Sequence, residues 1–394
     1  MKLLIANLGS TSFKYRLFDM STEVQVAQGG IDRIGGEMSK CFVELGGVRH
    51  ESQMVVKDHS VAVQKCLDQL TDPEIGCLES ATDVSAIGFK AVHGGSYSGV
   101  QLITPDVLNE MESMGQAAPA HNPPYVSAMR LVGKQFPNLP LVAAFETGFH
   151  QTIKDAQRYY AIPRQWAEQF QIKKWGFHGA SHRFIGERMQ QLLAAKAPRV
   201  ISCHLGGSNS LCAMRDGISV ANTLGMSPQT GIPHNNRVGD FDPFAIPIVM
   251  RETGKSLEEV LEDLANRSGL LGLSGISGDC RDLEDAAAAG DQNAQLALDV
   301  FVAEVRRHLG GLFLQLGGAE AIVFTGGIGE NGVTIRTAVC EGLSELGICI
   351  DPRRNQSIKN EMLISTDSSQ VQIWVVPTNE EIVVARQTKL LLEG

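Results

Sequence analysis

The chain has 394 residues, of which 43% are apolar and 20% charged, and its formal net charge is -10. This length gives room for two domains of ordinary size, each with its own hydrophobic core. The negative charge, without any run of Lys and Arg, excludes an extended nucleic-acid surface, so an anionic ligand must be held by local groups.

The N-terminus, MKLLIANLGS, has an apolar run that Asn7 interrupts, and no later segment is apolar enough to cross a bilayer. We therefore expect a cytoplasmic protein. The eight cysteines are scattered without the spacing of a metal site, which predicts buried, reduced thiols.

The first residues of the chain recur at half its length. Leu3–Gly9 (LLIANLG) aligns with Val200–Gly206 (VISCHLG), and Asp19 then falls on Asp216. Both segments read as strand, small-residue turn and strand, and such turns leave backbone N–H groups free to hold an anion. Two ordinary hairpins would give the same local pattern. The matched spacing and the position at the head of each half favour a duplicated fold with its ligand between the halves.

Further elements of the first half follow an α/β order. Residues 59–70 have helical spacing, residues 84–92 read as a buried strand, and residues 139–145 read as a strand that ends at Glu146. Ligands bind at the carboxyl ends of strands in α/β sheets. A carboxylate in this position is either a solvated loop charge or a metal ligand, and composition alone favours the loop charge.

A segment between the halves, Gly176–His182 (GFHGASH), places His178 between two glycines and before a helix. The helix N-terminus favours a negatively charged ligand close to it. His178 and His182 could form an i, i+4 metal pair, but His178 precedes the expected helix start, so zinc is discounted.

The second half contains a long loop, residues 224–243, that is rich in Gly and Pro and carries one arginine, Arg237. Loops of this length are functional or disordered. An apolar stripe predicts a helix over residues 292–316. Residues 321–324 read as a buried strand before the glycine-rich loop 325–332, which has the outline of a nucleotide-binding loop but not the GxGxxG or Walker pattern.

The last strand, residues 371–377, leads to a terminal helix. Thr378 with Glu381 fits a capping box, which gives Glu381 a structural role and leaves Glu380 as the freer carboxylate.

Taken together, these motifs resemble the acetate kinase family, which includes propionate kinases, over essentially the full length of the chain. The resemblance is carried by residues 7–14, 92–95, 121–123, 149–152, 176–182, 204–206, 237–243, 274–281, 324–331 and 378–385.

The resemblance implies the duplicated two-domain α/β fold of the acetate and sugar kinase, Hsp70 and actin superfamily, with a nucleotide cleft between the domains. We expect an N-terminal domain at 1–147 plus 382–394 and a nucleotide-binding domain at 148–381. The implied reaction is reversible transfer of a phosphoryl group from ATP to a short-chain carboxylate, with Mg²⁺ and release of ADP. The family also implies a homodimer.

Individual roles follow from the same resemblance. His178 would stabilise the transferring phosphoryl group, and Arg237 would hold carboxylate and phosphoryl oxygens. Asn7 and Glu380 would organise the metal. Phosphates would be held by the two hairpins and adenosine by later loops, through Ser10, Ser12, Lys14, His204, Gly206, Gly207, Asp279, Arg281, Gly326, Gly327, Ile328, Gly329 and Asn331. The wall of the acyl pocket would come from Val92, Ala120, Phe177 and Pro228.

The chain departs from the family pattern at several site positions. Lys90 stands where the family has Arg, and lysine cannot make the bidentate contact of a guanidinium. Glu146 replaces the catalytic Asp and is one methylene longer. Ala120 replaces a Leu. Residues 205–208 (LGGS) and 228–232 (PQTGI) replace Leu-Gly-Asn-Gly and Pro-Leu-Glu-Gly-Leu.

Three functions are consistent with these motifs. A Mg²⁺- and ATP-dependent carboxylate kinase is the leading hypothesis, with Lys90 and Glu146 among its catalytic groups. The substitutions at these two positions motivate the alternative of a catalytically weakened nucleotide-binding protein with a regulatory or scaffolding role. An ATPase similar to actin or Hsp70 shares the fold but lacks the Gly-Phe-His-Gly segment.

Overall fold

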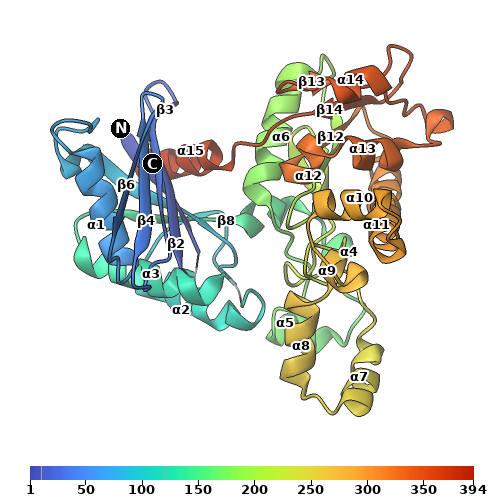
Figure 1. Ribbon diagram of the computed structural model, residues 1–394, viewed down its shortest axis with the longest axis horizontal. Helices are drawn as coiled ribbons and strands as arrows, with labels where there is room; N and C mark the ends of the chain where they lie inside the picture. Colours follow the sequence, from blue (N-terminus) through green and yellow to red (C-terminus); the bar gives the residue numbers. More distant parts are fainter. Residues whose placement is uncertain (10, 120) are drawn as a thin grey trace. The chain divides into compact units, whose positions relative to one another are not determined.

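The computed structural model describes residues 1–9, 11–119 and 121–394. The chain divides into two compact units (Figure 1). Unit 1 comprises Met1–Phe149 and Asn379–Gly394, and unit 2 comprises His150–Thr378. The boundaries predicted for the functional domains, after residues 147 and 381, remain a prediction.

Unit 1 is built on an eight-stranded sheet with the order β5-β4-β3-β2-β1-β6-β8-β7. Strands β1 to β5 form an antiparallel meander, β1, β6 and β8 run parallel, and β7 is antiparallel to β8. The strands are β1 (Lys2–Leu8), β2 (Ser12–Asp19), β3 (Val24–Asp32), β4 (Ser39–Leu45), β5 (Val48–Met54), β6 (Val84–Ala91), β7 (Val100–Leu102) and β8 (Leu141–Phe145).

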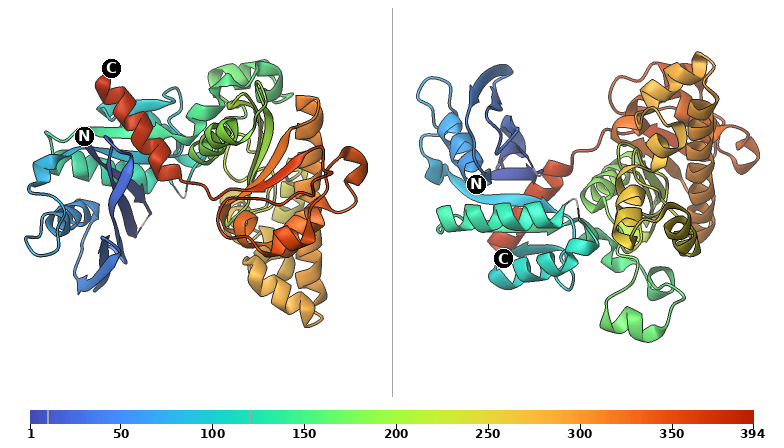
Figure 2. Two further views of the ribbon diagram at one scale, coloured as in Figure 1. Left: turned by 90° about the horizontal axis from the view of Figure 1, so that it is seen from above. Right: turned by 60° about the horizontal axis from the view of Figure 1, so that its bottom comes forward.

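Helices cover both faces of this sheet because alternate residues of β1 point to opposite sides. Leu4, Ala6 and Leu8 belong to the core formed with residues of α1 and α3. On the other face, a Cβ atom at Gly88 would lie 2.5 Å from Thr388 Oγ1 in α15 and 2.9 Å from Ile5, so the terminal helix packs tightly on β6. Figure 2 shows α15, in red, beside the strands of unit 1. The helices are α1 (His59–Leu70), α2 (Pro105–Ser113), α3 (Asn122–Gln135) and α15 (Glu380–Glu393).

Unit 2 repeats the topology of unit 1. Its sheet has the order β11-β10-β9-β12-β14-β13, with β9, β12 and β14 parallel and the other neighbours antiparallel. The corresponding order in unit 1 is β3-β2-β1-β6-β8-β7. The predicted duplication of an α/β fold is therefore confirmed. The strands are β9 (Arg199–His204), β10 (Ser210–Arg215), β11 (Ile218–Asn222), β12 (Ala321–Thr325), β13 (Met362–Leu363) and β14 (Gln372–Val375).

The long helix of unit 2 was predicted with its bounds, and α11 (Gln292–Leu316) packs its apolar stripe on β9 and β10. Ile201 and Cys203 of β9 belong to this core. The other helices are α4 (Asp155–Arg158), α5 (Arg164–Gln169), α6 (Gly179–Leu192), α7 (Ile246–Thr253), α8 (Leu257–Asn266), α9 (Gly269–Ser274), α10 (Cys280–Ala288), α12 (Gly326–Asn331), α13 (Val333–Cys340) and α14 (Pro352–Gln356).

The expectation of unpaired thiols is met, since all eight cysteines are free and six of them are buried. Across the described parts of the chain, no helix combines the length and the apolar character that a membrane crossing requires.

Candidate active site

In unit 1, polar residues gather at the carboxyl ends of three neighbouring parallel strands. Asn7 lies near the end of β1, Lys90 near the end of β6, and Glu146 directly after β8. Glu380 is the first residue of α15, which contacts all three strands. The fold therefore brings two carboxylates and an ammonium group to one edge of the sheet. The N-terminus of α15 stabilises the negative charge of Glu380.

Lys90 forms an ion pair with Glu380. Burial favours the neutral amine, but Glu380 and Glu146 outweigh it and raise the pKa of Lys90 above its usual value. Lys90 is therefore charged at neutral pH. Glu146 is only 5% exposed, so it is not the solvated loop charge that composition favoured.

The oxygen donors near Asn7 are of the type that Mg²⁺ accepts. Asn7 Oδ1 accepts a hydrogen bond from the hydroxyl of Tyr125 at 2.9 Å, and an amide oxygen has a second lone pair. Mg²⁺ is commonly held by one or two protein oxygens together with waters and substrate phosphates. Asn7 and Glu380 fit this pattern. Within residues 1–9, 11–119 and 121–394 no group of three or more His, Cys, Asp and Glu side chains could hold a metal by itself.

The predicted capping box at the start of α15 is wrong. Asn379 caps this helix, and its side chain accepts a hydrogen bond from the Ile382 amide at 3.2 Å. Asparagine is a stronger N-cap than threonine, so the helix begins one residue later than a Thr378 cap would require. Glu381 instead pairs with Arg16 at 3.5 Å. Glu380 thus remains the carboxylate at the strand ends, for a different reason.

In unit 2, His178 is held in a strained conformation at the start of α6. It occupies the left-handed region with φ of 55°, as the residue preceding the helix. Such conformations are costly for residues other than glycine and concentrate at functional sites. Gly176 makes room nearby, because a Cβ atom there would lie 2.7 Å from the His150 ring.

The ring of His178 lies in a cluster of histidines and serines. It stacks on His204 with a centroid distance of 4.3 Å, and its Nδ1 is 2.7 Å from Ser210 Oγ. Ser181 Oγ lies 2.8 Å from His204 Nδ1. His182 joins the cluster through Ser210, whose Oγ lies 2.8 Å from His182 Nε2.

Arg237 is held by its own loop. Its Nη1 donates to the Pro228 carbonyl at 2.8 Å, and its carbonyl accepts from the His234 amide at 3.0 Å. Burial lowers the pKa of Arg237 to about 10, so it stays charged at neutral pH. The backbone of Gly269 packs closely against this loop, because a Cβ atom there would lie 2.2 Å from the His234 carbonyl oxygen.

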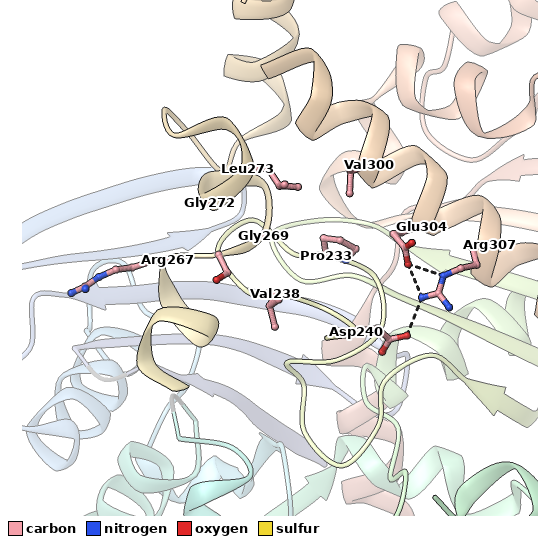
Figure 3. A pocket seen from close by; sticks show the side chains of 11 residues that line it. Pro233, Val238, Asp240, Arg267, Gly269, Gly272, Leu273, Val300, Glu304 and Arg307 are labelled. Atoms are coloured by element: carbon pink, nitrogen blue, oxygen red, sulfur yellow. Dashed lines mark hydrogen bonds and ion pairs between the residues drawn. The ribbon is translucent and has the colours of Figure 1, made fainter. Parts of the chain in front are cut away.

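Asp240 ties this loop to α11. Its Oδ1 accepts from the Gly231 amide at 2.8 Å, and its Oδ2 pairs with Arg307 at 3.0 Å. Figure 3 shows Asp240 and Glu304 both directed at the Arg307 guanidinium, beside a cavity of about 480 Å³ that the loop shares with α9 and α11. The charged groups at this end of the cavity are therefore engaged with one another.

Most of the predicted nucleotide residues of unit 2 line a single cavity of about 480 Å³. Gly326 must be glycine, since its φ is +77° and a Cβ atom would lie 2.7 Å from the Leu205 carbonyl oxygen. That carbonyl accepts hydrogen bonds from the Ile328 and Gly329 amides at 2.8 and 3.0 Å. The predicted residues that line the cavity are Gly206, Gly207, Asp279, Arg281, Gly327, Ile328 and Asn331.

The region expected as a glycine-rich loop is instead helical. Residues Gly326–Asn331 form α12 directly after β12. Asp279 caps α10 and pairs with Arg281 at 2.6 Å, and these contacts lower the pKa of Asp279 to about 2.

Comparison with known proteins decides the family. A sequence model described as the acetokinase family matches residues 2–386. The acetate kinase of Anoxybacillus flavithermus is 40% identical over 393 residues, covering 99% of this chain and 98% of that protein. The chain belongs to the acetokinase family.

Solved structures agree with this assignment. The acetate kinase of Porphyromonas gingivalis has a TM-score of 0.90 and 34% identity, covering 99% of both chains. A propionate kinase from Francisella tularensis has a TM-score of 0.90 and 32% identity, covering 98% of both chains. The acetokinase fold therefore extends over the whole chain, and the third hypothesis, an ATPase similar to actin or Hsp70, is set aside.

Other predicted site residues of this acetokinase lie beside these groups or outside the described residues. Lys14 is paired with Asn7 in the β1–β2 ladder and lines a small cavity of unit 1 with it. Phe177 is 2% exposed, and its carbonyl oxygen lies 2.8 Å from His150 Nε2. Ser10 and Ala120 lie outside the described residues. Val92 follows β6 directly in unit 1, and the Pro228 carbonyl in unit 2 accepts from Arg237; the acyl wall formed with these residues stays a prediction.

The sequence did not predict all of the residues that line the cavity of about 480 Å³ containing Gly206 and Asp279. Asn235 and Glu284 are the polar additions, and burial raises the pKa of Glu284. Asn235 lies in the loop 224–243, part of which departs from the family pattern. That departure was the one feature of the sequence that pointed to this loop. Glu284 follows Arg281 by one helical turn and so faces the same side of α10.

Proposed function

We propose that this acetokinase transfers the γ-phosphoryl group of ATP to a short-chain carboxylate and releases ADP and an acyl phosphate. The observation that carries the proposal is the cavity of unit 2, which is lined by residues from four separate segments, three of which the family implies to hold nucleotide. Full-length similarity to acetate and propionate kinases supports the choice of a carboxylate as acceptor.

The reaction requires little covalent help from the protein. One carboxylate oxygen of the substrate attacks the γ-phosphorus while the bond from that phosphorus to the bridging oxygen of ADP breaks. The substrate is deprotonated near neutral pH, so no general base is needed. Catalysis then consists of positioning and of neutralising charge on the equatorial oxygens.

We assign this neutralisation in unit 2 to His178 and Arg237. A histidine at a helix N-terminus, held at a strained φ, is placed to donate to an anionic oxygen. Arg237 keeps its charge and can pair with the carboxylate and phosphoryl oxygens. His204, stacked on His178, would approach the nucleotide phosphates.

In unit 1 we assign Mg²⁺ to Asn7 and Glu380, with Lys14 and Ser12 on the phosphate hairpin. Bound Mg²⁺ would neutralise charge on the phosphates. Lys90 and Glu146 lie at the same strand ends, and the ammonium of Lys90 holds the Glu380 carboxylate in place. Lys90, which stands where the family has arginine, therefore has Glu380 as its ion-pair partner in this chain.

The remaining expectations are part of the same proposal. Adenosine would be held by Asp279, Arg281 and α12, including Gly326 and Gly329. We further propose a homodimer in the cytoplasm. The comparisons do not favour the alternative of a catalytically weakened regulatory protein.

The test is a hydroxylamine trap for acyl phosphate, with the full chain, MgATP and acetate, propionate or butyrate. The proposal predicts acyl hydroxamate together with stoichiometric ADP for at least one of the acids. ADP release without hydroxamate would show hydrolysis of ATP and would overturn the proposal, and binding of ATP without turnover would support the regulatory alternative.

A further inference from the structure

A chain of hydrogen bonds runs from His178 into the interior of unit 2. His178 Nδ1 lies 2.7 Å from Ser210 Oγ, and the same hydroxyl lies 2.8 Å from His182 Nε2. His182 Nδ1 in turn lies 3.0 Å from Ser202 Oγ. Ser210, His182 and Ser202 are all fully buried, with relative exposures of 0%.

The strand register explains how these groups meet. Ser210 pairs with His204 across β9 and β10, and Ser202 lies two residues before His204, so all three side chains lie on one face of the sheet. The intervening Cys203 and Leu211 belong to the apolar core on the opposite face. The polar face is the one on which α6 places His178 and His182.

His182 in this chain is neutral. Burial and the neighbouring His150 and His204 lower its pKa well below 6.5. A neutral imidazole carries one N–H and one lone pair, so His182 donates through one nitrogen and accepts through the other. This leaves two arrangements of protons along the chain.

In the first arrangement, His182 donates to Ser202 and accepts from Ser210, so Ser210 must accept from His178 Nδ1–H. A neutral His178 then has its lone pair on Nε2. In the second arrangement, His182 donates from Nε2 to Ser210, and Ser210 donates to His178 Nδ1. A neutral His178 then carries its proton on Nε2.

We propose that Ser210 is a positioning residue for phosphoryl transfer, whose hydroxyl donates to His178 Nδ1 and thereby makes Nε2–H the donor toward the phosphoryl group. The inference rests on the proposed function, since it concerns the state of His178 in that reaction. An anionic phosphoryl oxygen selects the second arrangement, because a lone pair on Nε2 would repel it.

A neutral His178 also suits its surroundings. Its ring stacks on His204 at 4.3 Å and lies 6.3 Å from His182, so a proton added to His178 would face two further imidazoles at close range. Serine, unlike a carboxylate, orients an imidazole without stabilising its cation. Ser210 thus supplies orientation and tautomer while leaving His178 neutral.

The experiment is ¹⁵N NMR of the histidine-labelled full chain with Mg²⁺ and a non-hydrolysable ATP analogue, with His178 assigned from a His178→Gln spectrum. We expect His178 to be protonated on Nε2 in the unmodified protein. In Ser210→Ala the fraction protonated on Nδ1 should rise and kcat should fall about tenfold or more, since the wrong tautomer of a catalytic histidine is costly. Affinity for ATP should stay within about twofold.

Ser210→Thr, which keeps the hydroxyl, should restore both the tautomer and most of kcat. A proton on Nδ1 in the unmodified protein would overturn the proposal, even if Ser210→Ala does not fold. An unchanged tautomer in Ser210→Ala, or a threonine variant that behaves like alanine, would also overturn it. Failure of the proposed function would show separately, as an absence of acyl phosphate from the unmodified protein.

Discussion

The ammonium group of Lys90 and the carboxylate of Glu380 form an ion pair that joins the end of β6 to the first turn of α15. The Lys90 side chain is 25% exposed and that of Glu380 is 14% exposed. Glu380 is the carboxylate that we propose as a ligand for Mg²⁺, whereas the next residue, Glu381, pairs with Arg16.

We predict that Glu380→Gln raises the Mg²⁺ concentration needed for half-maximal activity by roughly tenfold, because a neutral amide is a much poorer ligand for a hard cation. Glu381→Gln is the matched control on the same helical turn and should change the requirement by less than about twofold. Mg²⁺ titration of the initial rate at saturating ATP measures both. Equal shifts in the two variants would remove Glu380 from the metal site.

The loop that carries Arg237 depends on Asp240. In Asp240→Ala the Gly231 amide loses its acceptor and the loop loses its link to α11. We expect kcat to fall about tenfold, because the lost hydrogen bond to a half-exposed carboxylate costs about 1 kcal/mol and Arg237 would no longer be held in place. Affinity for ATP should be unchanged.

The control for this loop is Glu304→Gln. Glu304 pairs with the same Arg307 but lies on α11 itself, so its replacement leaves the hydrogen bond between Asp240 and Gly231 in place. Steady-state kinetics of both variants make the comparison. A loss of turnover in Glu304→Gln as large as in Asp240→Ala would mean that the ion pair with Arg307, rather than the loop hydrogen bond, matters.

Buried neutral histidines make unit 2 sensitive to acid. Burial lowers the pKa of His150 to about 4 and that of His234 to about 3. Below the unfolded-state pKa of about 6.5 the unfolded chain takes up protons that the folded chain does not, so the free energy of unfolding falls with pH by about 1.4 kcal/mol per pH unit for each histidine.

His150→Gln should reduce this sensitivity, because glutamine cannot titrate and can still hydrogen-bond to Ser219. The loss of unfolding free energy between pH 7 and pH 5 should be smaller by about 2 kcal/mol in the variant than in the unmodified protein. Chemical denaturation at the two pH values measures this. An identical loss in both proteins would show that His150 is not the group that resists protonation.

The preferred carboxylate substrate is predicted from the sequence alone, since Ala120 lies outside the described residues. Ala120 stands where the family has a leucine. Two or three extra substrate carbons that fill the vacated space would gain roughly 1–2 kcal/mol of binding free energy. We expect kcat/KM to favour propionate or a longer acid over acetate, and Ala120→Leu to reverse this. A neighbour such as Ile232 or Tyr125 could fill the space instead, and then the ratio of butyrate to acetate activity would not change in Ala120→Leu.

The sequence predicted those parts of the fold in which local pattern and tertiary packing agree. The stripe of α11 and the paired hairpins of β1–β2 and β9–β10 are local signals, and the structure confirms them. The capping box at Thr378 failed because a stronger cap, Asn379, stands one residue later. Glycine-rich residues 326–331 were predicted as a loop but form a helix, since Leu205 supplies acceptors for their amides.

Site residues that depend on long-range packing could not be predicted from local pattern. Ser210 reads as an ordinary strand residue, and only the register of β9 and β10 and the position of α6 bring its hydroxyl to His178 and His182. Asn235 lines the cavity proposed for the nucleotide and comes from a loop with no periodic signal. In both cases the function of the residue depends on segments distant in sequence.

The most direct test of the account is acyl-phosphate formation by His178→Ala and Arg237→Ala, with the affinity for ATP measured in parallel by calorimetry. Neither residue lines the cavity proposed for the nucleotide, so we predict that kcat falls by about a hundredfold or more while ATP binds almost as in the unmodified protein. Turnover within about twofold of the unmodified protein in either variant would contradict the account, as would a loss of ATP binding that matches the loss of turnover.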